Sequence, residues 1–207
     1  STQGYSSAAS DVYKRQTLLL PVAGLYDTVE AVPCGGAEAE LLTRGIAVDC
    51  PPAENLCLKA WRLMRRLYGV DAVRITLDKR VPFGAGLGGG SSDATAILLR
   101  RDELFGLRLP EERLIGLAAE LGSDTAFFVR GTPQLCTGRG DVMTPFALDL
   151  SGYRLLIVKP EQGISTREAY RGVRPQVPEV LLADRLRRPV GCLLYTSPSP
   201  RDYAASR

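Results

Sequence analysis

Residues 82–93 read Pro82-Phe83-Gly84-Ala85-Gly86-Leu87-Gly88-Gly89-Gly90-Ser91-Ser92-Asp93, and this stretch decides the fold. Five glycines within seven positions leave the loop almost without side chains, so its backbone can approach another group closely. Two serines and an aspartate follow, which are residue types that begin helices, and apolar residues from Ala94 to Phe105 recur at helical spacing. The loop amides and the helix N-terminus would converge on one point. This arrangement predicts an anion site, and we expect the anion to be phosphate.

Two well-known glycine-rich motifs do not fit this stretch. Gly84, Gly86 and Gly89 match G-x-G-x-x-G, but a dinucleotide-binding fold also requires a second strand that ends in an acidic residue about 20 residues later. Residues 107–112 read instead as a loop and a helix start. A Walker A loop places a lysine after its last glycine, whereas a serine follows here. A flexible glycine linker is disfavoured, because linkers rarely run from an alternating strand straight into a capped helix.

The segments before the loop predict strands and one helix. Residues 17–32 are apolar and β-branched, which favours strand, and residues 40–49 are predicted to form a pair of short strands. Apolar residues from 56 to 67 fall on one helical face, and Gly69 is a natural end for that helix. Residues 73–78 alternate strictly, which predicts a half-buried strand that leads into the loop.

The segments after the loop continue the mixture of helices and strands. Residues 91–105 and 111–121 predict helices, and Gly122 would close the second one. Phe127-Phe128-Val129 reads as an aromatic strand. Further strands are predicted at residues 134–136, 142–143 and 153–158.

Three charged residues near these elements are open to more than one interpretation. Lys79 and Arg80 end the strand before the loop, where they could counter phosphate charge or could simply be solvated bases, and spacing does not decide between these roles. Asp124 lies in a tight turn, where an aspartate on its own is usually a turn former. Near a phosphate loop, however, an aspartate can orient or deprotonate an accepting hydroxyl, and we favour that role.

Composition excludes several classes of function. The 207 residues are 45% hydrophobic and 24% charged, as in ordinary globular proteins, and a net charge of +3 is too small to indicate nucleic acid or a membrane surface. The chain has no histidine and its five cysteines form no C-x-x-C pair, so neither a zinc site nor a His-based triad is expected, and no metal-ligating residues are assigned. The longest apolar run, residues 18–25, is far shorter than a membrane span. We expect reduced thiols and a cytoplasmic, bacterial protein.

Three segments, residues 79–94, 121–128 and 164–166, together carry a family resemblance. In this order and at these separations they resemble the 4-diphosphocytidyl-2-C-methyl-D-erythritol kinases of the GHMP kinase superfamily. The resemblance implies an α+β, two-layer GHMP kinase fold. Its N-terminal ATP-binding domain, of the ribosomal protein S5 domain 2-like type, would span residues 17–150, and its C-terminal domain would begin at residues 151–190.

The resemblance also implies an activity and a set of site residues. The family phosphorylates the 2-hydroxyl of 4-diphosphocytidyl-2-C-methyl-D-erythritol in non-mevalonate isoprenoid biosynthesis, with ATP and Mg²⁺ as cofactors. The partner that this implies is the small-molecule substrate, and neither nucleic acid nor a membrane is expected. Asp124 falls on the catalytic aspartate. The loop residues around the ATP phosphates would be Pro82, Phe83, Gly84, Ala85, Gly86, Leu87, Gly88, Gly89, Gly90, Ser91 and Ser92, the two serines also near Mg²⁺. Asn55, Leu56 and Lys79 fall at the adenosine end, and the cytidine side would be formed by Arg139, Thr166 and Tyr170, whose ring would stack on cytosine.

Several elements of the family pattern are missing from the sequence. The strand with the catalytic lysine, a Gly-Tyr-His motif and a third glycine-rich motif are absent, and Ala126 replaces the usual proline beside Asp124. Residues 1–16 and 191–207 show neither periodicity nor helix caps and are expected to be non-native or disordered tails. We therefore expect an internal fragment, truncated at both ends, that is inactive in isolation.

Two alternatives to this function remain open. The chain could come from another GHMP small-molecule kinase, which would accept galactose, homoserine or mevalonate. It could also be a non-catalytic nucleotide- or RNA-binding module, because a fold does not by itself determine function. An RNA-binding module would show a basic face with stacking aromatic residues, whereas this chain has an intact glycine loop and a modest net charge.

Overall fold

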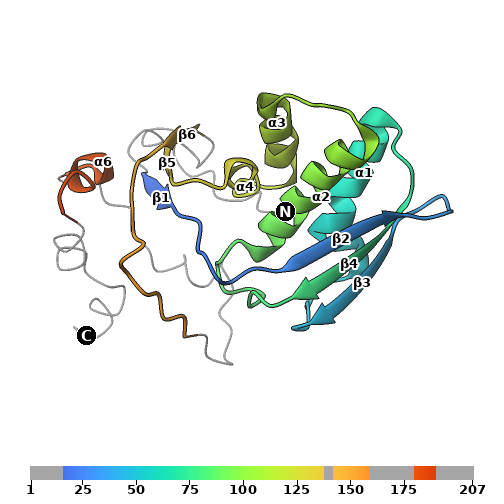
Figure 1. Cartoon of the computed structure of the whole chain (residues 1–207), viewed down its shortest axis with the longest axis horizontal. Coiled ribbons are helices and arrows are strands. Elements are labelled where there is room, and N and C mark those ends of the chain that lie inside the picture. Colours follow the sequence, from blue (N-terminus) through green and yellow to red (C-terminus); the bar gives the residue numbers. More distant parts are fainter. Residues whose placement is uncertain (1–15, 138–141, 159–179, 190–207) are drawn as a thin grey trace, which may run out of the picture.

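The computed structural model describes residues 16–137, 142–158 and 180–189. Three helices lie on one side of a three-stranded sheet, and a second small sheet lies at the other end of the molecule, next to the short helix α4 (Phe127–Arg130) (Figure 1). This mixture of helices and sheets confirms the predicted α+β class. The glycine loop lies at the end of the central strand of the first sheet, where the chain passes from the sheet layer to the helix layer.

The first sheet is built around strand β4 (Val73–Lys79), which lies between β2 (Thr28–Pro33) and β3 (Glu40–Gly45). β4 runs antiparallel to β2 and parallel to β3. A parallel pair needs a crossover connection, and helix α1 (Leu56–Tyr68) provides it between β3 and β4. Alternate residues of β4 are buried, and this alternation ends by turning Lys79 toward the helices.

The second sheet has the order β1 (Thr17–Leu19), β5 (Gln134–Thr137), β6 (Val142–Pro145), with antiparallel pairing throughout. Its first strand therefore comes from the beginning of the described chain and its other two from beyond residue 133. The short helix α6 (Leu182–Arg185) lies near β1, because the backbone amide of Ala183 donates to the side-chain oxygen of Gln16 at 3.1 Å.

Local sequence signals explain where the longer helices begin and end. The side chain of Asn55 accepts a hydrogen bond from the Cys57 amide at the start of α1, after a single 3₁₀ turn over Pro52–Glu54, and Gly69 ends α1 in the left-handed conformation. Helix α2 (Gly89–Phe105) follows the glycine loop, and α3 (Glu111–Leu121) ends at Gly122. The largest core side chains, each below 2% exposed, are Trp61, Met64, Ile75, Leu77, Ile97, Leu98 and Leu117.

The prediction of two short strands in residues 40–49 was wrong. The chain forms the single strand β3, which ends at Gly45 with a φ of 77°. A Cβ at Gly45 would lie 2.3 Å from the carbonyl oxygen of Lys79, so this glycine allows close approach to β4 and does not form a hairpin turn. The amide of Ile46 then donates to that same carbonyl at 2.8 Å.

Two other predicted strands are also absent. Phe127 and Phe128 begin the short helix α4 (Phe127–Arg130), which Gly131 ends with a φ of 60°. A short apolar run does not distinguish strand from helix, and here the glycine decides. Residues 153–158 form no strand, and Leu156 is 86% exposed. None of the described residues supplies a neighbouring strand for this segment, so its backbone has no ladder to join.

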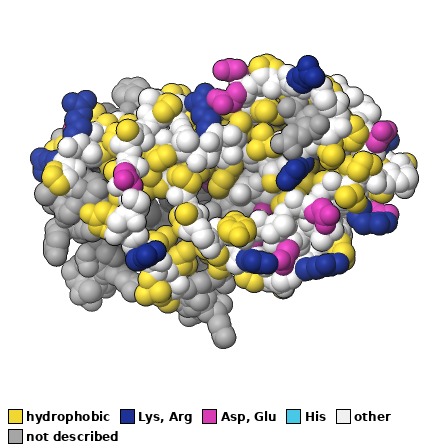
Figure 2. Space-filling view, in the orientation of Figure 1, with side chains coloured by type: hydrophobic (Ala, Val, Ile, Leu, Met, Phe, Trp, Pro, Cys, Tyr) yellow, Lys and Arg dark blue, Asp and Glu magenta, His cyan; other side chains and the backbone are white. Residues whose placement is uncertain are grey.

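The surface of the described residues carries charges of both signs. Basic and acidic side chains are interspersed with apolar ones over the face seen in Figure 2, which presents no continuous basic stripe among the described residues. That distribution does not favour the RNA-binding alternative on this face. Within the described part of the chain, each helix is too short or too polar to cross a membrane.

The buried position of Leu98 in α2 makes a direct prediction about stability. Leu98→Ala would leave a cavity where the side chain is fully buried, so we expect the free energy of unfolding to fall by about 2–5 kcal/mol in urea titrations. Leu67→Ala on α1 is the matched control, because Leu67 is 41% exposed, and it should cost less than about 1 kcal/mol. Equal losses in the two variants would contradict this assignment of the core.

Candidate functional site

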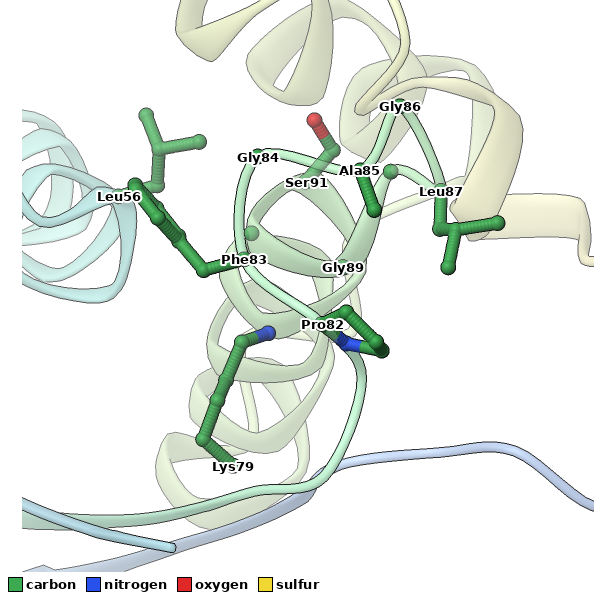
Figure 3. A pocket seen from close by; sticks show the side chains of 12 residues that line it. Leu56, Lys79, Pro82, Phe83, Gly84, Ala85, Gly86, Leu87, Gly89 and Ser91 are labelled. Carbon is green, nitrogen blue, oxygen red and sulfur yellow. The ribbon is translucent and has the colours of Figure 1, made fainter. Parts of the chain in front are cut away.

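A pocket forms where β4, the glycine loop and the start of α2 meet (Figure 3). Leu56 of α1 and Phe83 lie at one side of it, and the Lys79 ammonium points toward the loop from the end of β4. The lining residues are Leu56, Lys79, Pro82, Phe83, Gly84, Ala85, Gly86, Leu87, Gly88, Gly89, Gly90 and Ser91. The predicted anion loop therefore lines one pocket from Pro82 to Ser91, whereas Ser92 and Asn55 are not part of the lining.

Backbone conformation explains why this loop is rich in glycine. Gly84, Gly86 and Gly88 have φ values of 69°, 71° and 69°, a region that residues with a side chain seldom adopt. Gly88 is also confined, since a Cβ there would lie 2.9 Å from Cζ of Phe128. At Gly89 a Cβ would lie 2.8 Å from the Lys79 Nζ. Substitution at these two positions would therefore push the loop away from α4 and from the lysine.

The start of helix α2 is open at the pocket. Gly88 precedes the helix without a side chain that could cap it, and the first residues, Gly89, Gly90 and Ser91, line the pocket. The first amides of a helix have no intrahelical acceptor, and the helix dipole makes this end positive. The seventeen-residue α2 thus presents free backbone donors to the pocket, which is the arrangement that binds phosphate groups.

A buried cluster of three charges lies directly beneath the loop. The Lys79 ammonium forms ion pairs with Asp27, just before β2, and with Asp93 in α2, the latter at 2.9 Å. All three side chains are buried, with exposures of 2%, 3% and 4% for Lys79, Asp27 and Asp93. The second oxygen of Asp27 accepts the backbone amides of Arg80 and Val81 at 2.6 and 2.7 Å. Two carboxylates therefore share one ammonium.

The environment of each group fixes its protonation. Burial alone would raise the pKa of Asp27, but hydrogen bonds from Lys79 and from the Val81 and Arg80 amides outweigh it and leave that pKa below its ordinary value. Burial disfavours the charged lysine, yet its bonds to both carboxylates raise the pKa of Lys79 overall. Burial, together with the charge of Asp27, raises the pKa of Asp93 to about 6 against the opposing effect of Lys79. The cluster is thus net negative at neutral pH.

These contacts show that the two basic residues at the strand end lie in different environments. Arg80 is a solvated base, because its side chain is 61% exposed and pairs at 3.0 Å with Asp78. Lys79 is not solvated, and its charge is already matched by two carboxylates. Sequence reasoning missed Asp27 and Asp93 as partners. In the sequence, Asp27 is only a carboxylate next to an apolar strand, and Asp93 is only a carboxylate at a helix start. Both patterns are common in proteins for other reasons.

Asp124 is not part of the pocket lining. It is exposed in the turn between α3 and α4, where the Ser123 hydroxyl donates to it at 3.3 Å. The turn is fixed to α2 because the hydroxyl of Thr95 donates to the Thr125 carbonyl at 2.9 Å. The Phe128 ring, three residues beyond that carbonyl, lies against Gly88. The turn that carries Asp124 is therefore braced against the helix that forms the pocket floor.

The remaining predicted site residues divide into two groups. Asn55 is buried and uses its side-chain oxygen to cap α1 at 2.9 Å, which positions Leu56 at the pocket edge. Arg139, Thr166 and Tyr170 lie outside the described residues. Among the described residues, no group of three or more His, Cys, Asp or Glu side chains is arranged to hold a metal ion.

Comparison with known proteins gives one consistent family. The family described as "GHMP kinases N terminal domain" matches residues 55–132. The 4-diphosphocytidyl-2-C-methyl-D-erythritol kinase of Bacteroides thetaiotaomicron is 40% identical over 177 residues, covering 84% of this chain and 64% of that protein. The protein of the same name from Parabacteroides distasonis is 42% identical over 146 residues, covering 70% and 54%.

A solved structure agrees with these relatives. The crystal structure of a 4-(cytidine 5'-diphospho)-2C-methyl-D-erythritol kinase superimposes with a TM-score of 0.59 at 32% identity, covering 79% of this chain and 59% of that one. This chain therefore spans less than two thirds of the length of these relatives. These matches confirm the predicted two-layer GHMP kinase fold. They also confirm the resemblance of this chain to the 4-diphosphocytidyl-2-C-methyl-D-erythritol kinases.

The glycine conformations predict a difference between two alanine substitutions. Gly84→Ala should cost about 1 kcal/mol of unfolding free energy, because its positive φ strains an alanine but nothing lies within 4 Å of the new Cβ. Gly88→Ala has the same φ and must also displace the Phe128 ring, so we expect a further loss of about 1–3 kcal/mol in chemical denaturation. Similar losses in both variants would mean that Phe128 does not confine the loop.

The raised pKa of Asp93 predicts a dependence of stability on pH. At pH values between the ordinary pKa of 3.8 and the raised pKa of about 6, Asp93 binds more protons in the folded state than in the unfolded state. The stability that Asp93 contributes is therefore present at low pH and is lost as the pH rises through about 6. Relative to Asp93→Asn, the natural chain should lose up to about 3 kcal/mol of unfolding free energy between about pH 4 and pH 7. Urea titrations across this range test it, with Asp78→Asn as an exposed control; parallel curves for the natural chain and Asp93→Asn would refute it.

Proposed function

The chain carries a GHMP kinase N-terminal domain, and from this premise we propose that it is part of an ATP-dependent kinase that phosphorylates an alcohol group of a small molecule. The observation that carries the proposal is the glycine loop that leads into an uncapped helix start at the pocket. Its amides suit a chain of phosphate groups, since they supply many donors without side chains in the way.

The loop differs from a Walker A loop in which groups create the positive electrostatic potential that attracts phosphate. In a Walker A loop a lysine reaches the phosphates, whereas here Lys79 is engaged by Asp27 and Asp93. We infer that the backbone amides and the dipole of α2 hold the nucleotide phosphates, with Leu56 and Phe83 facing the nucleoside end. The three glycines with positive φ keep these amides accessible to a phosphate oxygen.

Asp124 is our proposed catalytic residue. An exposed carboxylate in a turn that is fixed to α2 can orient the accepting hydroxyl and take its proton while the oxygen attacks the terminal phosphorus. The hydrogen bond from Thr95 to the Thr125 carbonyl would keep that carboxylate at a constant distance from the loop. ATP supplies the transferred phosphoryl group. Mg²⁺ would be held mainly by phosphate oxygens, with Ser91 and Ser92 nearby, because Mg²⁺ commonly binds through substrate phosphates.

The substrate follows from the names of the relatives. Both relatives and the solved structure described above are kinases of diphosphocytidyl-methylerythritol, at identities from 32% to 42%. We therefore propose 4-diphosphocytidyl-2-C-methyl-D-erythritol as the substrate, phosphorylated on its 2-hydroxyl for non-mevalonate isoprenoid synthesis. Arg139, Thr166 and Tyr170 remain the predicted contacts for its cytidine group.

We place the protein in the bacterial cytoplasm. Cys34, Cys50, Cys57 and Cys136 are all free thiols, which suits a reducing compartment. Burial, with the nearby charge of Asp93, raises the pKa of Cys57 far above its usual value, so this thiol stays neutral and unreactive.

A direct assay tests the proposed function. The complete protein that contains this chain should transfer phosphate from ATP to the diphosphocytidyl substrate, measured as ADP release and as the phosphorylated product. Preference for galactose, homoserine or mevalonate would move the chain to another branch of the superfamily. Salt-dependent RNA binding without nucleotide binding would favour a non-catalytic module.

The role of Asp124 can be tested in the same complete protein. Asp124→Asn keeps the size and polarity of the side chain but removes the base, so we expect kcat to fall by about 10²–10⁴-fold with little change in ATP affinity. Ser123→Ala, in the same turn, is the matched control and should keep kcat within about threefold. If Asp124→Asn weakened ATP binding as much as it lowered kcat, Asp124 would be a nucleotide contact and not the base.

A further inference from the structure

The two ends of the glycine loop are connected through the buried charge cluster. At the beginning of the loop, Asp27 accepts the amides of Arg80 and Val81, the last residues before Pro82. At the end of the loop, Asp93 lies in the first turns of α2. Lys79 bonds to both carboxylates, so one ammonium links the beginning of the loop to its end.

The packing around Lys79 is so tight that a shift of its ammonium would also move the start of α2. A Cβ on Gly89, the first residue of α2, would lie 2.8 Å from Nζ of Lys79 and 3.0 Å from Cγ1 of Val81. The ammonium and the valine therefore pack directly against the helix start. Because all three charged side chains are at most 4% exposed, water does not screen them, and a displaced partner would leave a buried charge unpaired.

We propose that Asp27, Lys79 and Asp93 are positioning residues, which hold the ends of the glycine loop together so that its amides face the phosphates, and that Lys79 does not act as a phosphate-binding cation. The statement about phosphate rests on the proposed function, whereas the statement about the loop does not. Two carboxylates already match the lysine charge, so the cluster adds no net positive field beneath the anion site.

The first test needs no ligand. Hydrogen exchange in the 207-residue chain would follow the amides of Arg80 and Val81, and the Ser92 amide, which donates to Gly88 at 2.9 Å at the far end of the loop. Asp27→Ala should speed exchange at all three amides by about tenfold or more. Asp27→Asn keeps an acceptor for the Arg80 and Val81 amides, so its exchange rates should stay within about threefold of those of the unsubstituted chain. Asp78→Ala, an exposed carboxylate on the same strand, is the control and should leave Ser92 unchanged.

The Ser92 amide decides between positioning and a purely local role. Asp27 makes no hydrogen bond to Ser92, so faster exchange there requires transmission through Lys79 and Asp93. If Asp27→Ala changed only Arg80 and Val81, the proposed link between the loop ends would be wrong. Should Asp27→Ala fail to fold, Lys79→Met supplies the same measurement, because it removes the link and leaves the Arg80 and Val81 hydrogen bonds in place.

The second test separates positioning from phosphate binding. Lys79→Met leaves two buried carboxylates unpaired and should weaken Mg-ATP binding by about tenfold or more in calorimetry. The triple variant Asp27→Asn, Lys79→Met, Asp93→Asn keeps the shapes without the charges, so binding should return to within about threefold of the natural chain. A triple variant as weak as Lys79→Met would identify Lys79 as a phosphate cation and overturn the proposal. If the complete protein that contains this chain bound no ATP, the proposed function would fail, and the exchange data would still decide the positioning role.

Discussion

The buried ion pairs of Lys79 constrain the rest of the site. A charge that is removed from water must be paired with good geometry, or the folded state loses several kcal/mol. Here the pairing requires three separate pieces of chain to meet: the segment before β2, the end of β4 and the first turns of α2. Once they meet, the glycine loop between β4 and α2 has both ends fixed. The loop can then be nearly free of side chains and still have a defined path.

A positive residue beside an anion site is usually assigned to the anion. In this chain the burial of Lys79 and its two partners argue for a different division of labour, in which neutral backbone donors face the pocket and the ionic contacts lie beneath them. Backbone amides cannot change their charge, and the dipole of α2 does not depend on a side-chain rotamer. The charge of the groups that face the pocket would therefore change little with pH, although the cluster beneath them contains a carboxyl group, that of Asp93, with a pKa of about 6.

Sequence reasoning succeeded where the signal was local. Gly69 predicts the end of helix α1, the alternation from Val73 predicts β4, and the glycines predict a loop at a helix start; each depends on residues only a few positions apart. It failed where a distant partner decides. The fate of Lys79 depends on Asp27, which is 52 residues away, and spacing could not reveal it. The sequence predicts a strand at Phe127 and Phe128 because a three-residue apolar run fits either structure, and Gly131 selects the helix.

The pairing of β1 with β5 has a consequence for the order in which the chain can fold. Thr17 lies opposite Cys136, so the second sheet cannot form until all of the first sheet and its helices have been synthesised. The entropy of closing so long a loop grows only slowly with its length, and the prior compaction of the intervening residues reduces it further. Among the described strands only β5 pairs with β1, so until β5 is made β1 lacks a described partner, and an open strand edge is a site where nascent chains associate. The short length of β1 limits that hazard.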